Sequence, residues 1–111
     1  MARRRPQVCK VDENHAQIVE ELRALGLSVT SLAKVANGCP DIVVGCEGMN
    51  FLFELKMPGK QLNEAEEKWR QTWRGQVNKA TSSREVLELM EEHLERMGKK
   101  LPLRAVGHLL L

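Results

Sequence analysis

Two acidic residues and a lysine occupy positions from which they could act together. Asp41 precedes a short β-branched run, and Glu54 and Lys56 stand two residues apart, alternating with Phe53 and Leu55. In a β-strand alternate side chains share a face, so Glu54 and Lys56 point one way and the two apolar residues the other. A charged pair opposite an apolar face is a candidate for chemistry. For such a pair by itself, a solvated strand face is the simpler interpretation.

Asp41 can be brought to this pair by a hairpin. If residues 41–45 pair with residues 50–56 about a turn at 46–49, Asp41 lies opposite Glu54. Opposed like charges destabilise a strand pair, and two carboxylates this close favour a cation between them. Mg²⁺ or Mn²⁺ would fit, because hard ions take carboxylates, waters and substrate phosphate as ligands. Lys56 would then stabilise charge on the phosphate. A register slip of one residue would remove this arrangement, and Asp41 would then only cap a turn.

The elements that must position these residues follow from periodicity and from turn residues. Apolar spacing predicts a helix over 12–25 that ends at Gly26, and Asn63 with Glu66 resembles a capping box at the start of a second helix. In order, we expect a helix over 12–25, extended chain over 27–35, strands at 42–44 and 50–56, a helix from about 63 to 75, a strand at 77–80 and a helix from 82 or 83 to 97. This alternation predicts an α/β fold with a mixed sheet.

These residues together resemble the PD-(D/E)xK nuclease superfamily, whose signature is similar to Pro40-Asp41 followed by Glu54-Leu55-Lys56. Three further stretches resemble small VRR-NUC domains. They are the ExxxQ-like opening at 13–17, the ExK strand and loop at 54–63, and the last strand and closing helix at 73–77 and 82–87. The resemblance covers about residues 12–95.

The resemblance implies a restriction-endonuclease-like core, a mixed β-sheet flanked by helices in the order α-β-β-β-α-β-α. It implies metal-dependent hydrolysis of DNA phosphodiester bonds, often at branched or flapped structures, with Holliday-junction-resolvase-like relatives that act as dimers. Asp41, Glu54 and Lys56 would be catalytic together with Glu13. Mg²⁺ or Mn²⁺ would be held by Asp41, Glu54, Glu13 and the backbone carbonyl of Leu55.

Secondary candidates come from the two helices. Gln17 would share a face with Glu13, one helical turn away, and Glu20 is the second choice on that helix. Glu66 departs from the family pattern, which has Gln at this position of an L-S/T-x-x-Q motif. A carboxylate there could bind a metal or accept a hydrogen bond, but it would repel phosphate. The alternative for Glu13 is an ordinary acid in the first turn of a helix.

Basic residues supply candidate contacts to DNA. Four of the 17 basic residues but none of the 15 acidic ones fall within residues 1–10. The arm could bind phosphate or could simply be a solubilising end. The candidate nucleic-acid-binding residues are Arg3, Arg4, Arg5, Lys60, Lys68, Arg70 and Arg74. Trp69 and Trp73 share a helix face with Ala65, which favours core packing over stacking on bases. The three histidines lack metal spacing, so we expect them to be structural or exposed.

The chain as a whole suits one domain of 111 residues. We expect a basic arm over 1–11, a nuclease domain over 12–97 and an apolar tail over 98–111. The tail is either a homodimer interface, which the dimeric relatives favour, or a segment that folds back on its own sheet. No apolar run approaches membrane-spanning length, and we do not expect the basic opening to be a secretory signal, because no apolar stretch follows its basic residues. We therefore expect a cytoplasmic protein with reduced cysteines, no membrane partner and no small-molecule cofactor.

Two other functions stay open at this stage. A nucleic-acid-binding module could keep the same fold without cleaving, and Glu66 in place of the family Gln favours it. A small scaffold or regulatory protein could use the basic arm and the apolar tail as partner contacts.

Overall fold

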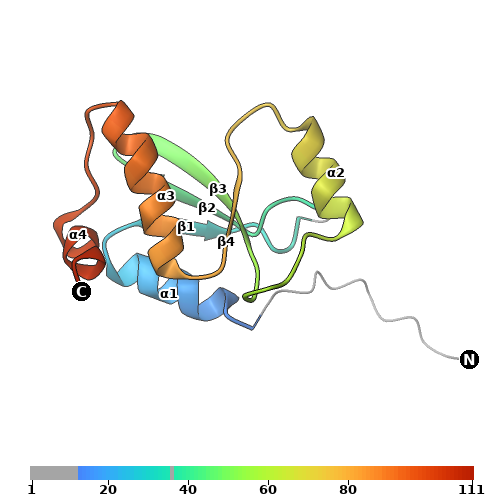
Figure 1. The fold of residues 1–111 in the computed structure, drawn as a ribbon, viewed down its shortest axis with the longest axis horizontal. Helices are drawn as coiled ribbons and strands as arrows, with labels where there is room; N and C mark the ends of the chain where they lie inside the picture. Colours follow the sequence, from blue (N-terminus) through green and yellow to red (C-terminus); the bar gives the residue numbers. More distant parts are fainter. Residues whose placement is uncertain (1–12, 36) are drawn as a thin grey trace, which may run out of the picture.

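The computed structural model describes residues 13–35 and 37–111, and four of its strands form one mixed sheet (Figure 1). The strands lie in the order β1 (Ser28–Ser31), β2 (Ile42–Cys46), β3 (Met49–Leu55) and β4 (Asn78–Ala80). β2 pairs antiparallel with both β1 and β3, whereas β4 runs parallel to β3. The α/β architecture and the mixed sheet predicted from the sequence are confirmed.

The hairpin of β2 and β3 has the predicted register. Glu47 and Gly48 form its two-residue turn with φ values of 52° and 76°, the left-handed conformation that suits the twist of an antiparallel pair. Ile42 pairs with Phe53, and the amide of Asp41 donates to the Phe53 carbonyl at 3.0 Å. Asp41 therefore continues the ladder by one residue and comes level with Glu54.

One face of the sheet carries the core. Helices α1 (His15–Ala24) and α3 (Ser83–Arg96) pack against it, and α4 (Leu103–Leu109) packs against α3 (Figure 1). Alternate strand residues point into this layer, as strand geometry requires. The side chains fully buried there include Ile42, Val44, Phe51, Phe53 and Leu55 from the sheet and Leu22, Leu87, Met90 and Leu94 from the helices. Consequently Glu54 and Lys56 lie on the opposite face.

Helix α2 (Glu64–Thr72) stands apart from the other helices and has no buried residue (Figure 1). Its predicted capping box is present: Asn63 accepts from the Glu66 amide, and Glu66 accepts from the Asn63 amide, both at 2.8 Å. Gly38, at φ +81° in the loop before β2, lets this loop come close to α2. A Cβ at Gly38 would lie 2.2 Å from the Ala65 carbonyl oxygen, so only glycine permits this approach.

One expected bound needs correction: the first helix begins at His15 rather than at residue 12, because Asn14 occupies the N-cap position. The segment over 98–111, expected to be an apolar tail, includes α4, and its Leu101 and Ala105 are part of the core. Leu103, Leu110 and Leu111 remain 89%, 82% and 97% exposed. In the part of the chain that the structure describes, no helix is long and apolar enough to span a bilayer.

Candidate functional site

Asp41 lies immediately before β2 and is buried, with 9% of its surface exposed. Its Oδ2 accepts a hydrogen bond of 2.7 Å from the amide of Leu55 on β3. Burial raises the pKa of Asp41, although the bond from Leu55 acts against this shift. The hairpin thus holds one oxygen of Asp41 in place.

Glu54 and Lys56 are also buried, with 6% and 7% exposed. Their interpretation as a solvated strand face is therefore wrong. Lys56 Nζ lies 3.9 Å from Glu54 Oε1 and 2.7 Å from Glu66 Oε1. The sheet face opposite the core accordingly carries a compact group of ionisable side chains, which we call the carboxyl cluster: Asp41, Glu54 and Glu66, with Lys56 beside them.

Glu66 joins this cluster from α2. Its Oε1 accepts from the Asn63 amide within the capping box and also from Lys56 Nζ. Burial acts to raise the pKa of Glu66, but hydrogen bonds with Glu54, Lys56 and the Asn63 amide outweigh it and lower the pKa. One carboxylate therefore both caps α2 and attaches this helix to β3.

Glu54 lies between the other two carboxyl groups. Burial is the largest cause of its shift, followed by hydrogen bonds and charge repulsion with Glu66 and Asp41, and together they raise the pKa of Glu54 to about 11. At neutral pH this shift favours the protonated form of Glu54, which shares hydrogen bonds with its neighbours. The proton on Glu54 relieves the repulsion expected between the opposed carboxylates of Asp41 and Glu54. A cation bound between them could relieve the same repulsion.

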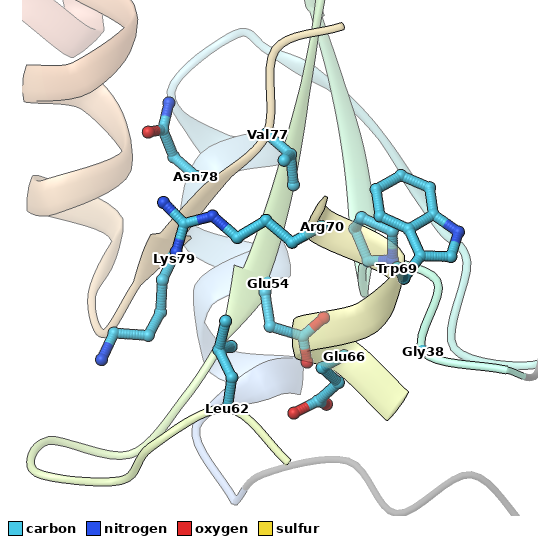
Figure 2. Close-up of a pocket in the computed structure, with 10 residues that line it drawn as sticks. Gly38, Glu54, Leu62, Glu66, Trp69, Arg70, Val77, Asn78 and Lys79 are labelled. Atoms are coloured by element: carbon cyan, nitrogen blue, oxygen red, sulfur yellow. The ribbon is translucent and has the colours of Figure 1, made fainter. Parts of the chain in front are cut away.

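A small pocket adjoins Glu54. Its volume is about 10 Å³, room for about one water molecule. Figure 2 shows Glu54 pointing from β3 towards Glu66, with Trp69 and Arg70 of α2 at the border of the pocket and Lys79 of β4 on the far side.

Several predicted residues lie elsewhere. Glu13 is exposed in the turn before α1, so its predicted place on the helix, one turn from Gln17, is wrong. Gln17 and Glu20 are exposed, whereas the buried residues of α1 are His15, Ile18, Val19 and Leu22. Lys60, Lys68 and Arg74 are exposed, as is Arg70, which also lines the pocket. Arg3, Arg4 and Arg5 lie outside the described residues.

Sequence reasoning missed two residues at the start of α1. Asn14 Nδ2 donates to the carbonyls of Lys56 and Thr81, at 3.1 and 2.9 Å, so it ties the helix to the ends of β3 and β4. His15 is buried, its Nε2 lies 3.5 Å from Ser31 Oγ, and its charge acts to lower the pKa of Asp41. Extending the stripe of Ile18 and Leu22 one turn upstream would have identified His15 as the inward-facing residue.

The tryptophans of α2 differ from the expectation of core packing. Trp73 is 46% exposed and stacks on Trp69, with ring centroids 4.7 Å apart. The periodicity that suggested a buried face marks a surface aromatic pair instead.

The donor set can be tested for its fit to a divalent cation. Within residues 13–35 and 37–111, no three His, Cys, Asp or Glu side chains form a ready-made metal-binding group. Mg²⁺, however, usually takes one or two carboxylates and completes its shell with water and substrate phosphate. Asp41 and Glu54 offer two such carboxylates in hydrogen-bond contact. These two carboxylates are a donor set that would suit a hard cation in place of the Glu54 proton.

Comparison with known proteins found no matching family model, curated protein or solved structure.

The cluster predicts how stability depends on pH. Because folding raises the pKa of Glu54 from 4.5 to about 11, the folded protein keeps a proton that the unfolded chain releases. The free energy of unfolding should then fall as pH rises between these two values. The raised pKa of Asp41 acts in the same direction, and the lowered pKa of Glu66 opposes it.

Urea denaturation in EDTA, at about pH 6 and about pH 9, measures this effect. Glu54→Gln should remove most of the decline and be more stable than the native chain at the higher pH. Glu95→Gln, an exposed position on α3, should keep the native slope. An equal decline in Glu54→Gln would mean that Glu54 ionises normally.

Proposed function

We propose that this protein is a metal-dependent endonuclease that hydrolyses DNA phosphodiester bonds, on a restriction-endonuclease-like core of the PD-(D/E)xK superfamily. The observation that carries the proposal is the meeting of buried Asp41 and Glu54 at level positions of β2 and β3, with buried Lys56 beside them. Burying three ionisable groups costs free energy that a purely structural hairpin would avoid.

In this proposal Asp41 and Glu54 hold Mg²⁺ or Mn²⁺, which supplies an activated water and polarises the phosphate when bound. The Leu55 amide fixes Asp41 Oδ2 and leaves Oδ1 for the ligand role. Lys56 donates to a phosphate oxygen and stabilises the charge that develops there. A direct role for the Leu55 carbonyl, and for Glu13, remains a prediction from the resemblance.

The preferred substrate in this proposal is branched or flapped DNA cut by a homodimer. A two-fold dimer would place one site on each strand of a branched junction. The exposed leucines after α3, namely Leu103, Leu110 and Leu111, offer an apolar surface for the second copy.

A non-cleaving nucleic-acid-binding module is the second candidate. The observation that favours it is the 2.7 Å pair between Lys56 and Glu66. In a catalytic site the phosphate must compete with Glu66 for this lysine. In a binding module the pair would only attach α2 to the sheet.

Incubation of the full chain with a four-way junction, a flap and linear duplex DNA separates the two candidates. Cleavage is expected with Mg²⁺ or Mn²⁺ and should stop when EDTA is added, because the carboxyl cluster would lack its cation. The flap and the junction should be cut faster than linear duplex. Binding without cleavage in either metal would contradict the nuclease and support the binding module.

A further inference from the structure

The stacked tryptophans on α2 form a surface that the carboxyl cluster does not explain. Trp69 and Trp73 lie with ring planes 21° apart, and Trp73 is 46% exposed. Helix α2 buries none of its residues, so the pair contributes little to a core. An exposed indole ring of this size is available to stack on something flat.

The backbone holds this pair in place. A Cβ at Gly75 would lie 2.8 Å from Trp73 Nε1, so the absence of a side chain lets the indole fold over the chain that follows α2. Thr72 Oγ1 donates to the Trp69 carbonyl at 3.1 Å and tightens the last turn of the helix. The stacked geometry therefore does not depend on a partner.

The pair is next to the carboxyl cluster. Trp69 lines the same pocket as Glu54 and Glu66 (Figure 2). A ligand that lies on the outer indole, Trp73, is thus one aromatic ring away from the pocket beside Glu54.

The charge around the pair narrows the class of ligand. Lys68 and Arg70 on α2 and Arg74 directly after it are exposed cations next to the pair in the sequence, while the first turn of the same helix carries Glu64, Glu66 and Glu67. Aromatic faces combined with positive charge are typical of surfaces that bind single-stranded nucleic acid. In duplex DNA the base faces are covered by their neighbours, so an indole could not reach them without unstacking the duplex.

We propose that Trp69 and Trp73 form a stacking platform for an unpaired base of a DNA strand, with the flanking cations on its phosphates. Entry of this strand into the carboxyl cluster rests on the proposed nuclease function, whereas the stacking on the two tryptophans is independent of it. The substrate would then be a strand with unpaired bases, such as a flap or a single-stranded end.

Intrinsic fluorescence tests the platform directly. The chain has two tryptophans and no tyrosine, so its emission reports this pair. The full chain in EDTA is titrated with a thymidine oligonucleotide, an abasic oligonucleotide of the same length and a blunt duplex. We expect the thymidine strand to quench the emission and to bind about tenfold more tightly than the abasic strand, which keeps the phosphates but offers no base to stack.

Two variants of Trp73 separate stacking from folding. Trp73→Ala should weaken binding of the thymidine strand about tenfold and leave the abasic strand unaffected. Trp73→Phe should recover part of the loss, because a smaller ring still stacks. Arg104→Ala, an exposed cation on α4, serves as the control for general charge and should bind as the native chain does.

Equal quenching and equal affinity for the thymidine and abasic strands would overturn the proposal. So would emission that changes with protein concentration and not with oligonucleotide, since a second copy would then cover the pair. Base-dependent quenching in a protein that never cleaves DNA would refute the nuclease and leave the platform standing. Cleavage of a flap that Trp73→Ala leaves unchanged in rate and affinity would refute the platform and leave the nuclease.

Discussion

Asp41→Asn is expected to lower the rate of metal-dependent DNA cleavage by about a thousandfold while the protein stays folded. A metal bound at the carboxyl cluster would contribute several kcal/mol of transition-state stabilisation, and about 1.4 kcal/mol corresponds to a factor of ten in rate. A neutral amide is a weaker ligand than a carboxylate for a hard cation. The oxygen of the new side-chain amide could still accept from the Leu55 amide, which now bonds to Asp41 at 2.7 Å.

The same substitution should leave the melting temperature unchanged or raise it. Burial raises the pKa of Asp41, so the charged carboxylate lowers the stability of the folded protein. An uncharged amide at this position, next to Glu54 and Glu66, avoids that loss of stability. Single-turnover cleavage at saturating Mg²⁺, with thermal unfolding of the same sample, measures both effects.

Glu95→Gln, on the exposed face of α3, is the control and should cleave at the native rate. Native activity in Asp41→Asn would remove this residue from the site. A large loss of melting temperature would show instead that Asp41 serves the hairpin.

The sequence was sufficient to predict the hairpin and therefore the meeting of Asp41 with Glu54. Short strands joined by a two-residue turn allow one register that keeps Ile42, Val44 and Phe53 on the same face, and the structure has that register. The local signals of α2 and α3 were similarly strong, because the caps at Asn63 and Ser82 depend on neighbouring residues.

Local sequence signals could not predict where whole helices lie relative to the sheet. The close approach of α2 to the loop at Gly38 is a tertiary contact, and it brings Glu66 to Lys56. The sequence showed Glu66 as a departure from a family pattern but could not show that it holds a buried lysine. Likewise, the spacing of Trp69 and Trp73 gives a helix face without saying whether a core covers it.

The start of α1 shows a different limit. The resemblance points to Glu13, yet the helix begins at His15, and His15 is the inward-facing residue there. Residues two apart on a helix point more than half a turn away from each other, so a motif match at Glu13 cannot replace the phase of the apolar stripe. The burial of Glu54 and Lys56 also depends on α2 covering them, which no pattern within β3 reveals.

Lys56→Met is expected to lower the free energy of unfolding by about 3 kcal/mol and also to abolish cleavage. The Lys56 side chain is 9% exposed and that of Glu66 is 14% exposed, so methionine would leave a nearly buried carboxylate without its cation. Breaking a buried ion pair from one side costs about 3–5 kcal/mol. The lower end applies here, because Glu66 keeps its bond from the Asn63 amide.

A second substitution separates stability from catalysis. The double variant Lys56→Met with Glu66→Gln leaves no unpaired buried charge between β3 and α2. The side-chain oxygen of the glutamine can still accept from the Asn63 amide and keep the cap of α2. Much of the lost stability should return, whereas cleavage should not, because no ammonium remains to stabilise charge on the phosphate. Lys100→Met, at an exposed position, should behave as the native chain in both measurements.

Urea denaturation and single-turnover cleavage of the two single variants and the double variant complete the cycle. If the double variant regains both stability and activity, Lys56 serves only to neutralise Glu66. If Lys56→Met alone is as stable as the native chain, the 2.7 Å contact between Lys56 and Glu66 does not hold α2 to the sheet. Stability regained without activity would assign Lys56 two separate roles, one in attaching α2 and one at the phosphate.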